Sequence, residues 1–215
     1  MTARVEHLTT AGQFSLDGGA WDVENNVWIV GDDSECVVVD APHDAEAIGA
    51  AIGGRRLRGV LCTHAHNDHV NAAGALADRF DAPIWLHPAD HDLWAMTYPD
   101  REPDVDFADG ATIAVAGAVL TAVHTPGHSP GGICLASADL GPSGVVFTGD
   151  TLFHGGPGAT GRSFSDFPTI LRSISERLLT LPPSTVVHTG HGDSTSIGAE
   201  SPHYEEWAKG LTTPG

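Results

Sequence analysis

Four metal-ligating side chains stand within six positions of the sequence, in segment 63–69, THAHNDH. In extended backbone alternate side chains share a face, so His64, His66 and Asp68 can converge on one point. His69 follows directly and, at the start of a helix, can turn toward a second point close by. Imidazole and carboxylate are ligands that Zn²⁺ and Fe²⁺ accept. A polar loop with chance histidines is the competing interpretation, but four such residues directly after an apolar strand favour a metal site.

Three further candidate ligands lie in glycine-rich turns. His128 lies in TPGHSPGG, Asp150 ends FTGD, and His191 lies in TGHG. Each turn follows a strand-like run. Because glycine lets the backbone approach a site closely, and because such turns often carry catalytic loops, these positions are suited to chemistry.

The elements that must position these side chains are short and alternate along the chain. Strands are expected at 27–30, 36–39, 60–62, 83–86, 112–116, 119–124, 132–137, 145–149 and 186–188. Helices are expected at 45–52, 70–80, 88–96, 167–178 and 202–209, with a loop at 97–110. The pattern predicts two packed sheets with helices outside, and the length fits one domain, 1–215.

The motif H-x-H-x-D-H, followed by His, Asp and His in that order, resembles the metallo-β-lactamase superfamily over residues 21–200, and within it the glyoxalase II-like group. The resemblance implies an αββα four-layer sandwich, in the α/β class, that holds two divalent metal ions. Zinc is the expected metal, with iron or manganese as alternatives. The implied ligands are His64, His66 and His128 for one ion and Asp68, His69 and His191 for the other, with Asp150 bridging them. Asp40, at a strand end, is expected to support the metal loop.

The same resemblance implies a hydrolase in which a metal-bridging hydroxide attacks a carbonyl and Asp68 orients it as the catalytic residue. Asp150 stands where the most familiar zinc β-lactamases have cysteine, which favours esters and thioesters over β-lactams. A thioester of a low-molecular-weight thiol is the expected substrate. An iron-dependent persulfide dioxygenase, a lactonase and a degenerate non-enzymatic member are the alternatives.

Candidate substrate residues lie outside the ligand set. Arg162, in a G-R segment after Asp150, is expected either to meet a polar substrate group or to form an internal ion pair. Trp94 and Tyr98 could form one wall of the pocket, although aromatic residues on a helix more often pack in the core. Three further histidines are expected to surround the site or lie at the surface rather than bind metal: His87, His91 and His154.

Composition argues against nucleic-acid and membrane partners, and the family resemblance implies a small-molecule substrate. The formal net charge is −18 with only ten Lys and Arg, which argues against nucleic-acid binding because phosphate contacts need clustered basic residues. No signal-peptide pattern and no membrane-spanning apolar run occurs, so a cytoplasmic protein is expected. Nothing in the sequence indicates an oligomeric state. Three scattered cysteines are expected to be buried free thiols: Cys36, Cys62 and Cys134.

The thiol carrier is the least constrained part of the interpretation. Typical glyoxalase II enzymes grip the carboxylates of glutathione with basic residues in an added C-terminal region, whereas the tail 201–215 offers only Lys209. An acidic protein without that clamp is poorly suited to a doubly carboxylated thiol. A less charged carrier such as mycothiol, as an acyl or formyl thioester, is the resulting hypothesis.

Overall fold

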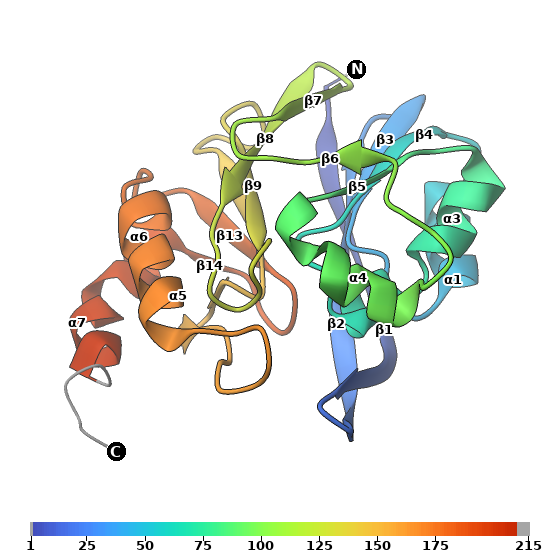
Figure 1. Cartoon of the computed structure of the whole chain (residues 1–215). Coiled ribbons are helices and arrows are strands. Elements are labelled where there is room, and N and C mark those ends of the chain that lie inside the picture. The colour runs from blue at the N-terminus through green and yellow to red at the C-terminus, as the bar shows by residue number, and fades with distance from the viewer. Residues whose placement is uncertain (1, 210–215) are drawn as a thin grey trace.

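The computed structural model describes residues 2–209 and contains two six-stranded sheets packed face to face with helices on both outer sides (Figure 1). The first sheet has the order β1-β2-β3-β4-β5-β6. Its strands are β1 (Arg4–Leu16), β2 (Gly19–Gly31), β3 (Glu35–Val39), β4 (Arg56–Leu61), β5 (Ile84–Leu86) and β6 (Val105–Asp106). The second sheet has the order β14-β13-β10-β9-β8-β7. Its strands are β7 (Thr112–Val115), β8 (Ala118–His124), β9 (Ile133–Ser137), β10 (Val145–Gly149), β13 (Val186–Thr189) and β14 (Thr195–Ser196).

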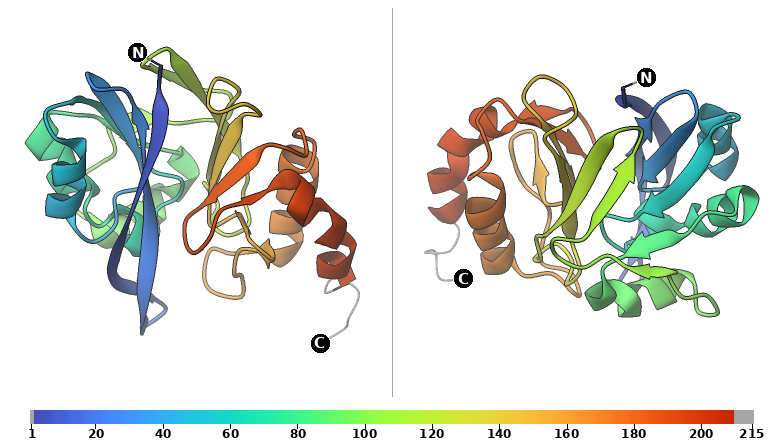
Figure 2. Two further views of the ribbon diagram at one scale, coloured as in Figure 1. Left: turned by 180° about the vertical axis from the view of Figure 1, so that it is seen from behind. Right: turned by 90° about the horizontal axis from the view of Figure 1, so that it is seen from above.

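The helices divide between the two outer layers, as both views in Figure 2 show. The first sheet is covered by α1 (Ala45–Ile52), α2 (Asn67–Val70), α3 (Ala73–Phe80), the 3₁₀ turn η1 (Pro88–Asp90) and α4 (His91–Thr97). The second is accompanied by α5 (Phe167–Ser173), its π-helical continuation η2 (Ile174–Leu178), α6 (Ile197–Glu200), the 3₁₀ turn η3 (Ser201–His203) and α7 (Tyr204–Ala208). A small hairpin, β11 (Leu152–Phe153) with β12 (Gly156–Pro157), stands apart.

Alternation along the strands explains the layers, because successive side chains point to opposite faces of a sheet. In β3, Val38 packs toward α1 and α3, whereas Val37 and Val39 pack between the two sheets. In β10, Phe147 faces the space between the sheets and Val146 faces α5. Three apolar layers result, and the expected αββα four-layer sandwich is confirmed.

The carboxyl ends of the parallel strands position the loops that carry the candidate ligands. Strands β3, β4 and β5 are parallel, and so are β10 and β13, so the carboxyl ends within each set meet at one edge. In open sheets with parallel strands, ligands bind beside such ends. The loop after β4 carries the THAHNDH segment, and the turns after β10 and β13 carry Asp150 and His191.

The structure departs from the expected elements in the loop expected at 97–110, which contains the short strand β6, and in two larger features. The helix expected at 70–80 is broken into α2 and α3, and the break lies at Asn71–Ala72, so that His69 stands on a short separate turn. Strand β1, with the first half of β2, was not expected. These two strands form a long hairpin that reaches beyond the body of the sheet, and much of its outer half is exposed, so its sequence lacks an apolar stripe.

The three cysteines are free and buried, as expected. None of the helices in the part of the chain from residue 2 to 209 is long and apolar enough to cross a bilayer.

Candidate metal centre

All seven candidate ligands meet at one edge of the sandwich. Their donor atoms form three groups, and within each group all atoms lie within 4.8 Å of one another. The groups are His64, His66 and His128; His64, His69 and Asp150; and Asp68, His69 and His191. The first and third coincide with the two ligand sets that the family resemblance implies.

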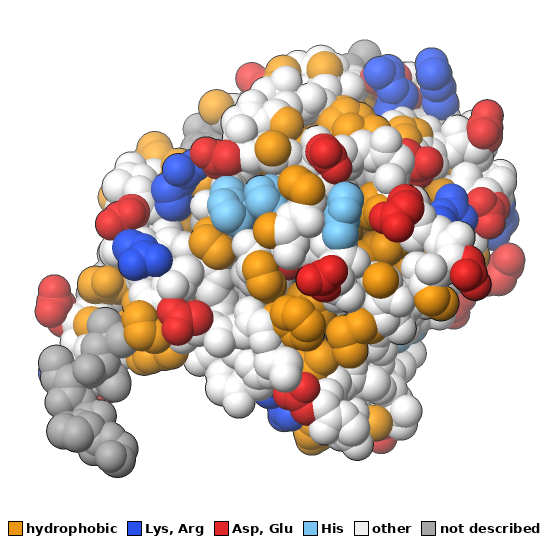
Figure 3. Space-filling model, in the orientation of Figure 1, with side chains coloured by type: hydrophobic (Ala, Val, Ile, Leu, Met, Phe, Trp, Pro, Cys, Tyr) orange, Lys and Arg blue, Asp and Glu red, His pale blue; other side chains and the backbone are white. Residues whose placement is uncertain are grey.

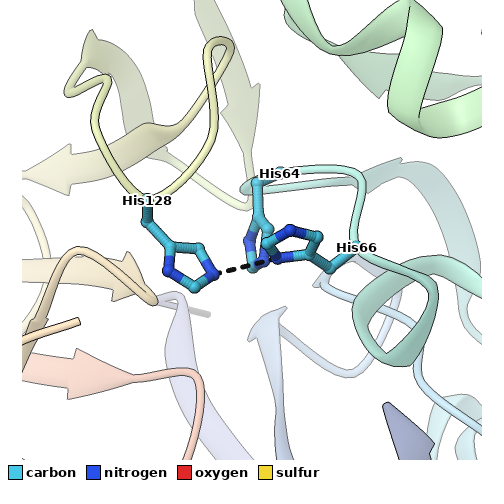
Figure 4. Close-up of side chains that lie close together, drawn as sticks. All are labelled: His64, His66 and His128. Atoms are coloured by element: carbon cyan, nitrogen blue, oxygen red, sulfur yellow. Dashed lines mark hydrogen bonds between the residues drawn. The ribbon is translucent and has the colours of Figure 1, made fainter. Parts of the chain in front are cut away.

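The first group consists of three imidazoles from two loops (Figure 4). His66 Nδ1 lies 2.9 Å from His128 Nε2, and the His64 ring stands nearly perpendicular to both of the other rings. His64 Nε2 is buried and has no hydrogen-bond partner. Three converging imidazole nitrogens are a donor set that Zn²⁺ accepts.

The second group adds carboxylates. His191 Nε2 lies 3.2 Å from His69 Nε2 and 3.4 Å from Asp68 Oδ2. Asp150 lies between the groups: its Oδ1 is 3.3 Å from His69 Nε2, and its Oδ2 is 3.5 Å from the Nε2 atoms of both His128 and His191. Oδ2 of Asp150 therefore lies between a histidine of the first group and one of the second, while Oδ1 faces His69, so the carboxylate can serve both groups.

The outer nitrogens of the histidines are held by acceptors. His128 Nδ1 donates to the carbonyl of Ala159 at 2.8 Å, and His191 Nδ1 donates to the carbonyl of Glu24 at 2.7 Å. Because a carbonyl oxygen only accepts, each Nδ1 carries the proton, which leaves Nε2 as the atom for a metal. Such outer hydrogen bonds are typical of metal-binding histidines.

Asp40 orients two ligands at once. Its carboxylate accepts hydrogen bonds from Thr63 N at 2.7 Å, Thr63 Oγ1 at 2.8 Å and His69 Nδ1 at 2.9 Å. Since the Thr63 hydroxyl gives its hydrogen to Asp40, it accepts from His64 Nδ1 at 3.1 Å. The supporting role expected for Asp40 is confirmed.

Asp90 was not identified from the sequence, although it ties the two loops of the first group together. It is fully buried in η1 and accepts from Ala65 N at 3.0 Å, Ser129 Oγ at 2.8 Å and Gly131 N. Burial raises the pKa of Asp90, while these three hydrogen bonds oppose the rise. The available signal was weak: Asp90 follows the end of β5 by four residues, whereas Asp40 directly follows β3.

Asn25 was also missed, and it holds Asp68. Its Nδ2 donates to Asp68 Oδ2 at 3.0 Å, and its Oδ1 lies 2.9 Å from His43 Nε2. Asn71 Nδ2 donates to the other ring nitrogen of His43, so Nε2 of His43 is the donor to Asn25. No sequence signal marked Asn25, because its burial in the middle of β2 is established only by the fold.

Two glycines are required by space at the centre. A Cβ atom on Gly190 would lie 2.3 Å from Asp150 Oδ1 and 2.8 Å from His69 Cε1. A Cβ on Gly127 would lie 2.3 Å from the backbone nitrogen of Ile170, at a φ of +134°. The glycine beside each ligand therefore leaves room for the ligand or for its turn.

The clustered histidines differ in the direction of their pKa shifts, and the pKa of the Asp68 carboxyl is lowered. Burial lowers the pKa of His66 to about 3 and, with the neighbouring histidines, lowers that of His64 well below its ordinary value. Burial opposes ionisation of Asp68, but the charge on His69 outweighs it and, with hydrogen bonds, brings the pKa to about 2. For His191, burial is likewise outweighed by the charge of Asp150, and the pKa rises to about 10.

The residues present fit divalent ions. Six buried side-chain nitrogen and oxygen atoms have no hydrogen-bond partner within residues 2–209, and four of them belong to the cluster: His64 Nε2, His66 Nε2, Asp68 Oδ1 and Asp150 Oδ1. Unpaired buried polar atoms are costly, and here they cluster among imidazoles and carboxylates, the ligands of divalent cations. The cluster is a divalent metal-binding site by its chemistry.

Arg162 lies in the wall of a cavity beside the first group. Its guanidinium stacks over the Trp21 ring at 3.8 Å and lies 5.8 Å from the centre of the Phe14 ring, while Phe14 packs edge-on to His66. Arg162, His66 and His128 all line this cavity. Arg162 makes no ion pair with the residues in 2–209, so the alternative of an internal ion pair is not realised.

The expected pocket wall of Trp94 and Tyr98 is wrong. Trp94 is 1% exposed, stacks on Tyr98 in the core, and donates from Nε1 to the Arg101 carbonyl. The Tyr98 hydroxyl donates to the carbonyl of Val70 and accepts from Gly74 N. Both rings therefore pack in the core between α4 and the first sheet, as is usual for aromatic residues on a helix.

Of the three histidines expected outside the ligand set, two lie outside the three ligand groups and the third lines a cavity at the cluster. His87 stacks on His124 at 4.1 Å, and His91 lies 3.7 Å from Asp106; neither belongs to the three ligand groups. His154 is exposed and lines a cavity of about 450 Å³ together with Asp150 and His191.

Comparisons with known proteins agree with this geometry. Residues 20–191 match the metallo-beta-lactamase superfamily. Hydroxyacylglutathione hydrolase GloC of Haemophilus influenzae is 30% identical over 184 residues, covering 79% of this chain and 85% of GloC. Among solved structures, the B3 metallo-beta-lactamase BLEG-1 superposes with a TM-score of 0.76 at 28% identity, covering 92% of this chain and 99% of BLEG-1. TTHA1623, solved in a di-iron-bound form, superposes with a TM-score of 0.73 at 31% identity, covering 83% of this chain and 93% of its own.

The fold, the ligand cluster and these similarities agree on one assignment. The chain belongs to the metallo-β-lactamase superfamily, as a metal-dependent hydrolase.

Proposed function

We propose that the protein hydrolyses a thioester of a low-molecular-weight thiol, with two divalent ions held by the seven clustered residues. The position of Asp150 carries this proposal, because its two oxygens face the histidines of both groups at 3.3 and 3.5 Å. Zinc suits the imidazole and carboxylate donors, and iron or manganese would also be accepted. The similar protein TTHA1623 has been solved in a di-iron-bound form, which supports iron as an alternative metal for this site.

The residues of the chain have defined tasks in such a reaction. When bound, the ions would supply a water of lowered pKa and polarise the carbonyl under attack. Asp68 is fixed through Oδ2 by Asn25, and its buried Oδ1, which has no hydrogen-bond partner, can hold a proton of the nucleophile and orient it. Asp40 and Asp90 hold the ligand loops in place through hydrogen bonds.

The leaving group favours a thioester. A thiol has a pKa of about 8.5, so a thiolate departs without a proton donor, whereas an alkoxide from a lactone needs one. The hydroxyl of Tyr98 is bonded to backbone in the core, and Tyr204 packs against Trp207 in α7. His154 is the side chain beside Asp150 that could give a proton, which makes it the position to test.

The carrier is constrained by charge. Of the described side chains that line the cavities at the cluster, Arg162 alone is a Lys or Arg. Acidic side chains are spread over the face shown in Figure 3, with basic ones scattered among them. A single cation supports a carrier with few anionic groups, which favours mycothiol over the doubly carboxylated glutathione.

A substrate panel tests the proposal. Purified protein is assayed with acyl-mycothiol, acyl-glutathione, a lactone, a β-lactam and a persulfide, with thiol release and oxygen uptake recorded in parallel. We expect thiol release from the thioesters, fastest from mycothiol. Turnover of the lactone or the β-lactam but not of thioesters would overturn the proposal, as would oxygen consumption on the persulfide by protein with one iron.

Arg162 provides a second arm of that test. Arg162→Met should raise KM for the acyl-mycothiol and acyl-glutathione substrates with little change in kcat, because the side chain is placed to bind the polar carrier rather than to react. Arg172→Met removes an exposed arginine on α5 and serves as the matched control. Equal KM values for the two variants would remove Arg162 from substrate binding.

A further inference from the structure

A second cavity, of about 580 Å³, adjoins the metal centre between the tip of the β1–β2 hairpin and α4. Its lining includes Leu16, Ala20, His66, Asn67, Leu93 and Met96. Leu16 and His66 also line the cavity that contains Arg162, so the two cavities meet at the first ligand group. Its volume lies within the range of about 300–1,000 Å³ found for small-molecule sites.

The second cavity has a lining of mixed polarity, with an apolar part formed by Leu16, Leu93 and Met96. Leu16 and Leu93 are buried in its wall, and Met96 exposes 61% of its surface at the mouth. Figure 3 shows hydrophobic side chains gathered on this face between α4 and the hairpin. Its lining contains no Lys or Arg in the described chain, and its one charged residue is the carboxylate Asp17, which accepts from Ser163 N.

The walls of this cavity are fixed to the ligand loop. Asn67, the residue before Asp68 in the metal motif, donates from Nδ2 to the Gln13 carbonyl at 2.8 Å. Its Oδ1 accepts from Ser15 N at 2.7 Å. These two bonds hold strand β1 against α2, so the cavity exists without a ligand and costs little to form on binding.

We propose that this cavity receives the acyl group of the substrate, while the thiol carrier extends toward Arg162. The inference rests on the proposed thioester hydrolysis and extends it to the acyl half. A carbonyl at the first ligand group has one direction past His66 into a cavity that has Leu16, Leu93 and Met96 in its wall and no Lys or Arg among its described lining residues, and another direction toward Arg162. An anionic or polar carrier suits the guanidinium, and an unbranched apolar acyl chain suits Leu16, Leu93 and Met96. The structure thus assigns acyl thioesters with apolar chains of several carbons as the preferred substrate class.

Binding to this cavity can be measured without catalysis. The chain has only two methionines, Met1 and Met96, so ¹³C-methyl-methionine labelling gives two signals, and Met96→Leu assigns them. Metal-depleted protein is titrated with 1-butanol, 1-hexanol and 1-octanol. We expect a saturable shift of the Met96 signal, with affinity rising by up to about fourfold per methylene. No saturable shift, or an affinity independent of chain length, would overturn the assignment.

Two variants localise the effect. Ala20→Trp places an indole in the cavity from an exposed hairpin position, and Val119→Trp, at an exposed position on β8, is the matched control. Alcohol binding should weaken at least tenfold in the first variant and stay at the wild-type level in the second. Equal binding in all three proteins would show that the alcohols bind elsewhere and would refute the proposal.

A kinetic arm separates this inference from the proposed function. The ratio of kcat/KM for hexanoyl over acetyl thioesters of one carrier should exceed unity in wild type and Val119→Trp, and collapse in Ala20→Trp. If thioesters are hydrolysed with no dependence on the acyl chain, the cavity assignment fails while the proposed function stands. If alcohols bind at Met96 but no thioester is hydrolysed, the proposed function fails and the apolar site remains.

Discussion

Replacing Asp40 with asparagine tests how the ligands are held, because it keeps size and shape and removes one acceptor. In Asp40→Asn the remaining oxygen can still accept from Thr63 N, which leaves the amide NH₂ facing the Thr63 hydroxyl and His69 Nδ1. The Nδ1–H group of His69 and the new amide NH₂ group are both donors, so they face each other with no acceptor between them. The conflict is relieved if the His69 proton moves to Nε2, the atom that faces His191 and Asp150. A protonated Nε2 cannot bind a metal.

The magnitude follows from comparable outer hydrogen bonds in metal sites. Loss of such a partner typically lowers metal affinity 10- to 100-fold, which is about 1.4–2.7 kcal/mol. The loss should be concentrated in the ion held by Asp68, His69 and His191, because Asp40 bonds to His69 directly and reaches His64 only through Thr63. Stability should fall as well, by about 1–3 kcal/mol for the buried hydrogen bond.

The assay is a competition titration of the two ions against a chromophoric chelator, with urea unfolding of the metal-free protein in parallel. Asp32→Asn is the matched control, since Asp32 Oδ1 also accepts three hydrogen bonds, from Ser34 N, Ser34 Oγ and Glu35 N, at the opposite end of β3. The control should lose stability and keep both metal affinities. Wild-type affinity for both ions in Asp40→Asn would refute the reasoning.

Three further outcomes are expected. Gly190→Ala should reduce the bound metal and lower kcat at least tenfold, because the added Cβ would lie 2.3 Å from Asp150 Oδ1. Elemental analysis measures the metal content, and Gly54→Ala is the control because its Cβ would meet nothing within 4 Å. Full metal content in both variants would contradict this prediction. His154→Ala should change kcat on thioesters less than about twofold, because a thiolate needs no proton donor; a loss of a hundredfold or more would instead make His154 the general acid. Burial lowers the pKa of His188 to about 4, so unfolding takes up a proton between pH 6.5 and 4 and the free energy of unfolding falls by up to about 3 kcal/mol as the pH drops through that window. Urea unfolding of metal-free His188→Asn should show a correspondingly smaller loss than wild type, and parallel curves for the two proteins would exclude this role of His188.

The sequence was sufficient for the ligand candidates because they are local. Four stand together after β4, and the other three each follow a strand in a glycine-rich turn, so their convergence needed only the strand ends to share an edge. The layers of the sandwich followed from apolar runs such as β3 and β10 for the same reason.

The parts that were missed depend on long-range contacts. Asn25 and Asp90 serve the centre through partners 43 and 25–41 positions away, and neither stands in a motif. Strand β1 forms a ribbon whose exposed tip gives no apolar pattern. Trp94 was misplaced because the face of α4 that packs on the sheet is decided by tertiary contacts, which a helical pattern alone does not reveal.

Metal content per chain tests the central claim most directly. Elemental analysis of the protein after loading and removal of free metal should give two divalent ions per chain for wild type, and one for His191→Ala, which removes a ligand of the second group alone. Wild-type protein that holds one ion or none, or His191→Ala that still holds two, would contradict the two-ion centre.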